Sequence, residues 1–138
     1  MSSLLIEGGR PISGRIDVEG NKNAALPLLA ACLLTTEECV LTNMPRIGDV
    51  EVMAKLLTEV GPEVHGVGTT TVRVKCREIL TSEPTSDLVG KLRGSVLLLG
   101  PLLARTGRAV LATPGGDFPA RRTIGTHMDA LRRLGARQ

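Results

Sequence analysis

Apolar residues recur along the first half of the chain at spacings typical of helices with one buried face. Residues 24–34 and 49–61 show this pattern. We expect Pro27 to lie in the first turn of the first helix, where a missing N–H is tolerated. Asp49 is a suitable N-cap for the second helix, and Gly61 is expected to end it.

Short apolar runs between turn residues predict strands around these helices. Five such runs are found, at 4–7, 14–19, 39–42, 63–67 and 70–75. Because Gly68 falls between the last two runs, we expect them to form a hairpin.

The second half of the chain repeats this order of elements. It predicts an apolar helix, a strand and an amphipathic helix, at 94–106, 108–112 and 124–134. The last helix would turn four apolar residues inward before Gly135 ends it: Ile124, Met128, Leu131 and Leu134.

The two halves align residue by residue at four points. Val40-Leu41 matches Val110-Leu111 after 70 residues, whereas Leu57 and Gly61 match Leu131 and Gly135 after 74 residues. The shift from 70 to 74 means that the second half has four additional residues, which fall in the loop around 114–117. In repeat proteins, an insertion confined to one loop is commonly found on the face that binds the ligand. Chance similarity of short apolar stretches is the alternative. The second unit stops after its amphipathic helix, so we expect an open end that either self-associates or continues into a larger protein.

Composition narrows the class of protein. The chain has 138 residues, enough for one domain with a core, and its only aromatic residue is Phe118. This argues against a nucleic-acid-binding protein that stacks bases on aromatic side chains. The net charge of +3 mildly favours an anionic partner. The three cysteines lack metal-ligand or disulfide-framework spacing, and there is no signal-like or membrane-spanning apolar segment, so we expect a cytoplasmic protein without a metal.

One loop carries candidate chemistry. Pro114-Gly115-Gly116-Asp117 precedes the tandem arginines Arg121 and Arg122. Exposed backbone N–H groups and guanidinium groups suit a phosphorylated or carboxylated small molecule, and a carboxylic acid can carry a proton. A solvated glycine-rich connection is the plainer interpretation.

Five motifs occur in order along the chain: Gly20-Asn21-Lys22-Asn23-Ala24-Ala25-Leu26-Pro27, Asn43-Met44-Pro45 with Asp49-Val50, Leu92-Arg93-Gly94-Ser95, Leu99-Gly100-Pro101-Leu102, and Pro114-Gly115-Gly116-Asp117 with Arg122. Together they resemble the N-terminal part of the UDP-N-acetylglucosamine enolpyruvyl transferase family. The first and last motifs are specific, and the middle ones are weak alone.

The resemblance implies an α/β fold of repeated βαβαββ units, in which three units build each of two domains as an inside-out α/β barrel. Residues 1–20 would supply strands that pair with the second domain. Residues 21–138 would form a partial domain, with repeats at about 21–90 and 91–138.

The resemblance also implies a reaction. The family moves the enolpyruvyl group of phosphoenolpyruvate to the 3′-hydroxyl of UDP-N-acetylglucosamine and releases phosphate, the first committed step of peptidoglycan synthesis. The reaction proceeds by addition and elimination without a cofactor. The implied partners are these two small molecules rather than nucleic acid or membrane.

Site residues follow from the matched motifs. By resemblance, Lys22, Asn23 and Arg122 contact phosphoenolpyruvate, and Asp117 is the catalytic acid. UDP-N-acetylglucosamine would be held by Arg93, Arg122, Thr123, Ile124, Gly125 and Thr126. From composition alone, the same positions are a helix-entry loop, surface arginines and a helix start. His65 and His127 are expected to be ordinary exposed or hydrogen-bonded histidines.

Two departures from the family pattern matter. Asp117 stands where a cysteine is commoner, and an aspartic acid keeps its proton near pH 7 only when it is desolvated or paired with another anion. The second domain and third repeat are not in this sequence, so we expect no turnover by this chain alone.

The alternative functions are a fragment of the sister enzyme that acts on shikimate 3-phosphate, or a non-catalytic module for nucleotide binding or assembly. The sister enzyme carries a serine after the lysine and an arginine soon after, whereas Asn23 follows Lys22 here and the next arginine is Arg46.

Overall fold

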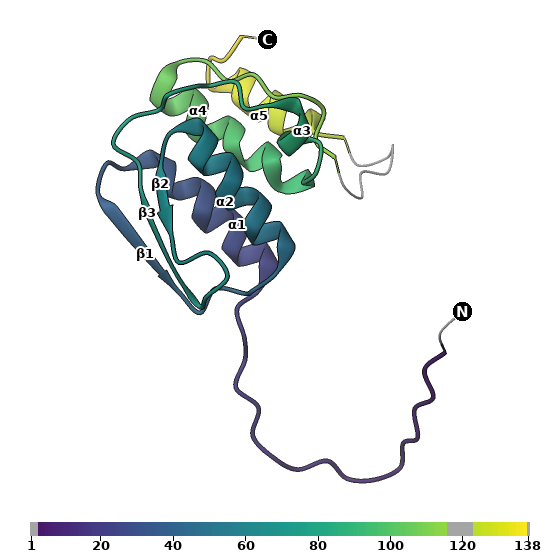
Figure 1. The fold of residues 1–138 in the computed structure, drawn as a ribbon. Coiled ribbons are helices and arrows are strands. Elements are labelled where there is room, and N and C mark those ends of the chain that lie inside the picture. Colours follow the sequence, from purple (N-terminus) through teal and green to yellow (C-terminus); the bar gives the residue numbers. More distant parts are fainter. Residues whose placement is uncertain (1–2, 116–122, 138) are drawn as a thin grey trace.

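The computed structural model describes residues 3–115 and 123–137. Figure 1 shows a three-stranded sheet covered on one face by two helices, with further helices stacked beyond them and an extended N-terminal arm. In chain order the elements are α1 (Lys22–Ala31), the 3-10 turn η1 (Cys32–Leu34), β1 (Glu38–Thr42), α2 (Gly48–Val60), β2 (Glu63–His65), β3 (Thr71–Lys75), α3 (Ser86–Val89), the 3-10 segment η2 (Arg93–Leu98), α4 (Leu99–Thr106) and α5 (Gly125–Arg133).

The sheet confirms the expected hairpin. Strand order is β1-β3-β2, and both pairs are antiparallel. Gly68 lies in the hairpin turn with a φ of +86°, a backbone conformation that a glycine adopts without strain. The strand expected at 39–42 is confirmed as β1.

Helix α1 begins earlier than the apolar pattern predicts. Asn21 caps it, because its side-chain oxygen accepts a hydrogen bond from the backbone N–H of Asn23 at 2.7 Å. Lys22 is therefore the first helical residue, and the expectation that Pro27 lies in the first turn is wrong. The apolar run to Leu34 continues as η1 rather than as α-helix.

Helix α2 also starts before its predicted cap. Ile47 is the N-cap residue, so Asp49 lies in the first turn and the prediction of Asp49 as cap is wrong. Gly61 ends the helix as expected, with a φ of +138°. The core forms where α1 and α2 cover the sheet, and Leu29, Leu57 and Val74 are fully buried there.

Among its described residues, the second half contributes helices but no strand. Residues 108–112 form none, although Val110 donates its N–H to the carbonyl oxygen of Ser82 at 2.9 Å. The predicted strand is wrong because no strand among the described residues runs beside this segment, and a strand needs a neighbour to complete its hydrogen bonds. The helix expected at 94–106 divides into η2 and α4.

Helix α5 packs only loosely beside α4. Met128 and Leu131 are half-buried, as their predicted inward orientation requires, but Leu134 is 84% exposed and its predicted inward orientation is wrong. Gly135 ends the helical segment with a φ of +100°.

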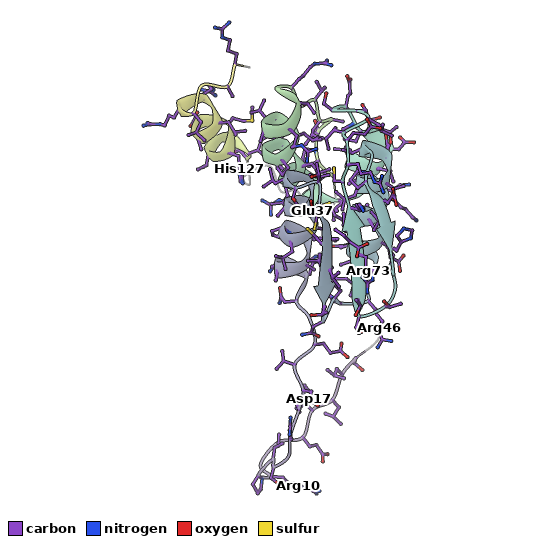
Figure 2. The ribbon with its side chains drawn as sticks, turned by 90° about the vertical axis from the view of Figure 1, so that its left-hand side faces the viewer. Arg10, Asp17, Glu37, Arg46, Arg73 and His127 are labelled. Atoms are coloured by element: carbon purple, nitrogen blue, oxygen red, sulfur yellow. The ribbon has the colours of Figure 1, made fainter. Side chains whose placement is uncertain are left out.

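The N-terminal arm extends away from the packed elements (Figures 1 and 2), and Arg10 and Asp17 lie along it in Figure 2. Neither strand expected at 4–7 and 14–19 forms within residues 3–20. Apolar side chains on the arm remain exposed, for example Ile16 at 90%. Near its base, the side-chain N–H of Asn43 donates to the carbonyl oxygen of Val18 at 3.4 Å.

Candidate functional site

A cavity of about 590 Å³ opens where the starts of α1 and α2 meet the segment around η2 and the first turn of α5. Among the described residues it is lined by Lys22, Asn23, Leu26, Pro27, Asp49, Lys91, Leu92, Arg93, Gly94, Val96, Leu97 and His127. Three residues that the family resemblance assigns to substrate binding, Lys22, Asn23 and Arg93, therefore share one cavity although they come from different elements.

The start of α1 places Lys22 and Asn23 at the cavity. The first N–H groups of a helix lack partners within the helix, and the helix dipole adds positive potential at this end. Asn21 satisfies one of these groups, the N–H of Asn23. An anion at this end of α1 would meet both the helix terminus and the Lys22 ammonium group.

Lys22 forms an ion pair with Asp49, the second residue of α2. The Lys22 Nζ lies 2.7 Å from Asp49 Oδ2, and the two side chains are 50% and 40% exposed. Sequence reasoning treated Asp49 as a helix cap and missed this pairing. The signal available was weak, since a carboxylate at the start of an apolar helix is also the usual sign of a cap.

Packing of Gly94 against the Leu26 side chain brings Arg93 to the same cavity. A Cβ atom at Gly94 would lie 2.9 Å from Leu26 Cδ1, so glycine allows the start of η2 to approach α1. The buried hydroxyl of Ser95 donates to the carbonyl oxygen of Val89 at 3.2 Å and anchors η2 from the other side. Arg93 itself is half-buried.

The described part of the glycine-rich loop approaches the segment that leads to Arg93. Gly115 donates its N–H to the carbonyl oxygen of Val89 at 3.3 Å. A Cβ atom at Gly115 would collide with the backbone of Gly90, so only glycine fits at this contact. The remaining predictions for this loop, Asp117, Arg121 and Arg122, fall outside the described residues.

The four residues predicted to hold the nucleotide lie at the start of α5. Thr123, Gly125 and Thr126 are exposed and Ile124 is half-buried. None of the four lines the cavity, but the next residue, His127, does. Figure 2 shows His127 on α5, away from Arg73 on the sheet. His65 lies on β2 and is exposed.

The charges in the cavity favour an anion. Lys22, Lys91 and Arg93 are positive, and Asp49 is the only carboxylate among the described residues of the lining. The described part of the chain contains no cluster of three potential metal ligands. A second groove of about 540 Å³, between α2 and the hairpin, carries Glu51, Lys55 and Glu59 with Val67 and has no excess of positive charge.

The cysteines lie apart from this cavity. Burial raises the pKa of the Cys32 thiol to about 12, and the neighbouring Cys39 contributes to this shift. Burial also raises the pKa of Cys76. Both thiols stay protonated at neutral pH, so they are poor nucleophiles. Cys32 is a core residue, as its apolar surroundings in the sequence predict.

Comparisons with known proteins agree with the motifs. A family model described as EPSP synthase (3-phosphoshikimate 1-carboxyvinyltransferase) matches residues 6–137. The UDP-N-acetylglucosamine 1-carboxyvinyltransferase of Treponema denticola is 44% identical over 137 residues, which cover 99% of this chain and 32% of that protein. The protein of the same name from Anaeromyxobacter dehalogenans is 47% identical over 138 residues, which cover 99% of this chain and 33% of that protein. The chain thus spans about a third of the length of these curated relatives.

A solved structure confirms the expected α/β fold class. The enolpyruvyl transferase NikO from Streptomyces tendae superposes with a TM-score of 0.63 at 28% sequence identity, and the match covers 74% of this chain and 24% of that one. No helix in the described residues is long and apolar enough to cross a bilayer.

Proposed function

The chain belongs to the EPSP synthase (3-phosphoshikimate 1-carboxyvinyltransferase) family, and on that premise we propose that it is part of a cytoplasmic enolpyruvyl transferase of peptidoglycan synthesis. The enzyme transfers the enolpyruvyl group of phosphoenolpyruvate to the 3′-hydroxyl of UDP-N-acetylglucosamine and releases phosphate.

The observation that carries this proposal is the gathering of Lys22, Asn23 and Arg93 at one cavity whose described lining residues carry an excess of positive charge. Lys22 and Asn23 bind the phosphoenolpyruvate anion at the N-terminus of α1, and Arg93 contacts the sugar nucleotide. A charge-assisted hydrogen bond from lysine or arginine contributes about 1.5–3 kcal/mol.

The chemistry needs a proton donor and stabilisation of charge. In the addition step an acid gives a proton to the methylene carbon of phosphoenolpyruvate, the 3′-oxygen of the sugar bonds to its central carbon, and the proton of the 3′-hydroxyl passes to a base or to water. In the elimination step the methyl carbon loses a proton and the carbon–oxygen bond to phosphate breaks. We assign Asp117 as the acid of the first step and Arg122 to neutralising the phosphoenolpyruvate charge.

The acceptor is assigned from the relatives and the opening motif. The curated relatives cited above are named for UDP-N-acetylglucosamine, and the sequence lacks the serine and arginine of the shikimate 3-phosphate enzyme after Lys22. The uridine nucleotide is held at the start of α5 by Thr123, Ile124, Gly125 and Thr126. The next residue, His127, lines the cavity.

Binding of the acceptor tests this assignment directly. In calorimetric titrations, we expect this chain to bind UDP-N-acetylglucosamine more tightly than shikimate 3-phosphate, and Arg93→Ala to weaken that binding. Arg73→Ala is the matched control, because Arg73 lies on the sheet outside the cavity lining. Tighter binding of shikimate 3-phosphate would refute UDP-N-acetylglucosamine as the acceptor. An equal loss of affinity in Arg93→Ala and Arg73→Ala would refute the proposed location of the site.

We propose further that this span does not turn over alone. One wall of a cleft neither excludes water nor orients two reactants, and orientation supplies much of an enzyme's rate. With both substrates present, phosphate release should match the blank. Release above the blank that is lost in Asp117→Ala would contradict this proposal and support Asp117 as the acid.

A further inference from the structure

Lys22 occupies an electrostatically unfavourable position. It is the first residue of α1, and α1 has no acidic residue in its first turn. The positive end of a helix dipole repels a cation there. Lys91 and Arg93 line the same cavity and add to the repulsion. Its flexible four-carbon side chain is half-exposed, so these forces alone would drive the ammonium group into solvent.

Asp49 occupies the opposite situation. It lies in the first turn of α2, where the helix dipole favours a carboxylate. It belongs to the cavity lining, and its Oδ2 lies 2.7 Å from Lys22 Nζ. One carboxylate thus bridges the starts of two packed helices.

We propose that Asp49 is a positioning residue that holds the Lys22 ammonium group at the cavity wall. This inference rests on the proposed function, because it makes Asp49 necessary for tight binding of phosphoenolpyruvate although its own charge repels that anion. The Lys22 ammonium group has three donors, so contact with Asp49 leaves donors for the ligand.

Removing the Asp49 charge has two opposite effects on ligand affinity: it removes a repulsion and it releases Lys22. Their magnitudes decide which one dominates. A carboxylate roughly 6 Å from the ligand anion weakens binding by about threefold in water, and less when screened by salt. Losing the position of Lys22 costs up to a whole charge-assisted hydrogen bond, which is about tenfold or more in affinity. Removing the Asp49 charge should therefore weaken binding, roughly three- to tenfold in dissociation constant, instead of strengthening it.

Three variants of this chain separate positioning from general electrostatics. Asp49→Asn removes the charge at nearly constant shape, and Asp49→Glu restores a carboxylate. Glu51→Gln removes the other acidic residue of the same helical turn, and Glu51 lines the groove next to the hairpin instead of the cavity. Two measurements are made on each: calorimetric titration with phosphoenolpyruvate, and side-chain NMR of the Lys22 Cε and Nζ groups, which reports how ordered the ammonium group is.

The proposal expects Lys22 to be ordered in the parent chain and in Glu51→Gln, and disordered in Asp49→Asn. Phosphoenolpyruvate should bind Asp49→Asn three- to tenfold more weakly, with at least partial recovery in Asp49→Glu. Lys22→Ala is the reference for loss of the ammonium group. Unchanged or tighter binding by Asp49→Asn, while Lys22→Ala weakens binding by about tenfold or more, would overturn the positioning role and leave the proposed function standing. Failure of the parent chain to bind phosphoenolpyruvate would overturn both.

Discussion

The first and second halves of the chain share a pattern of apolar residues but bury it to very different extents. In the first half, α2 packs over three paired strands and buries six residues: Val50, Met53, Ala54, Leu56, Leu57 and Val60. In the second half, α5, the helix that the predicted repeat matches to α2, buries none, and the segment 108–112, which it matches to β1, forms no strand. The comparison shows that an amphipathic pattern predicts a helix, whereas its burial depends on strands elsewhere in the sequence.

Leu57 and Leu131 are matched to each other by the predicted repeat and provide the largest contrast. Leu57 is fully buried in the core, and Leu131 is half-buried beside α4. Leu57→Ala should lower the free energy of unfolding by about 2–5 kcal/mol, because it leaves a cavity in the core. Leu131→Ala should cost about 1 kcal/mol or less, and urea unfolding measures both. Equal losses would show that α5 is as firmly packed as α2.

The glycines that end α2 and α5 are a second pair matched by the predicted repeat. Both have positive φ, +138° at Gly61 and +100° at Gly135. A Cβ atom at Gly61 would lie 2.7 Å from the carbonyl oxygen of Glu78, whereas one at Gly135 meets nothing within 4 Å. Gly61→Ala should therefore cost about 2–3 kcal/mol and Gly135→Ala about 1 kcal/mol, the cost of backbone strain alone. Thermal unfolding of both variants compares them, and a larger loss at Gly135 would contradict the packing described.

Arg105 joins the two halves. Its guanidinium group on α4 donates to the carbonyl oxygens of Leu33 at 2.6 Å and Arg77 at 3.4 Å. Arg105→Met keeps most of the apolar stem and removes these donors, so we expect a loss of about 1–2 kcal/mol in unfolding free energy. Arg108→Met is the control, because Arg108 forms only an exposed ion pair with Glu83 at 3.5 Å among the described side-chain contacts. Equal effects in chemical denaturation would mean that Arg105 does not connect the halves.

At alkaline pH, we expect the free energy of unfolding to depend on pH through the first half, which contains all three cysteines. Because burial raises the pKa of Cys32 from 9.0 to about 12, the unfolded chain loses this proton before the folded chain does. Stability should therefore fall as pH rises from about 9 toward 12, by at most about 1.4 kcal/mol per pH unit for this group. Denaturant titrations at pH 8, 9 and 10 measure the slope. A slope that is unchanged in Cys32→Ala would contradict this origin.

Local patterns predicted the fold where the interacting residues are near in sequence. The β2–β3 hairpin was predicted because its two strands and Gly68 are adjacent, and α2 because its apolar spacing is regular. The strands at 4–7, 14–19 and 108–112 were predicted from the same kind of pattern and are wrong for the described residues. A strand forms only where another strand pairs with it, and that partner can be distant in sequence. A short apolar run therefore does not show whether a partner exists.

The candidate site was predicted by resemblance and not by spacing. Composition alone favours a helix-entry loop at Lys22 and a surface arginine at Arg93, and nothing in their separation places them at one cavity. Asp49 illustrates the limit most clearly: its residue type fits a helix cap, but the packing of α1 against α2 turns it toward Lys22. Asp117 and Arg122 remain predictions.

The location of the phosphoenolpyruvate site is the central claim, and NMR mapping of the ligand on this chain tests it most directly. We expect the largest changes in chemical shift at Lys22, Asn23 and Arg93, and little change at Lys55 and Val67 in the groove next to the hairpin. Changes centred on that groove, with Lys22 and Arg93 unaffected at saturation, would contradict the account.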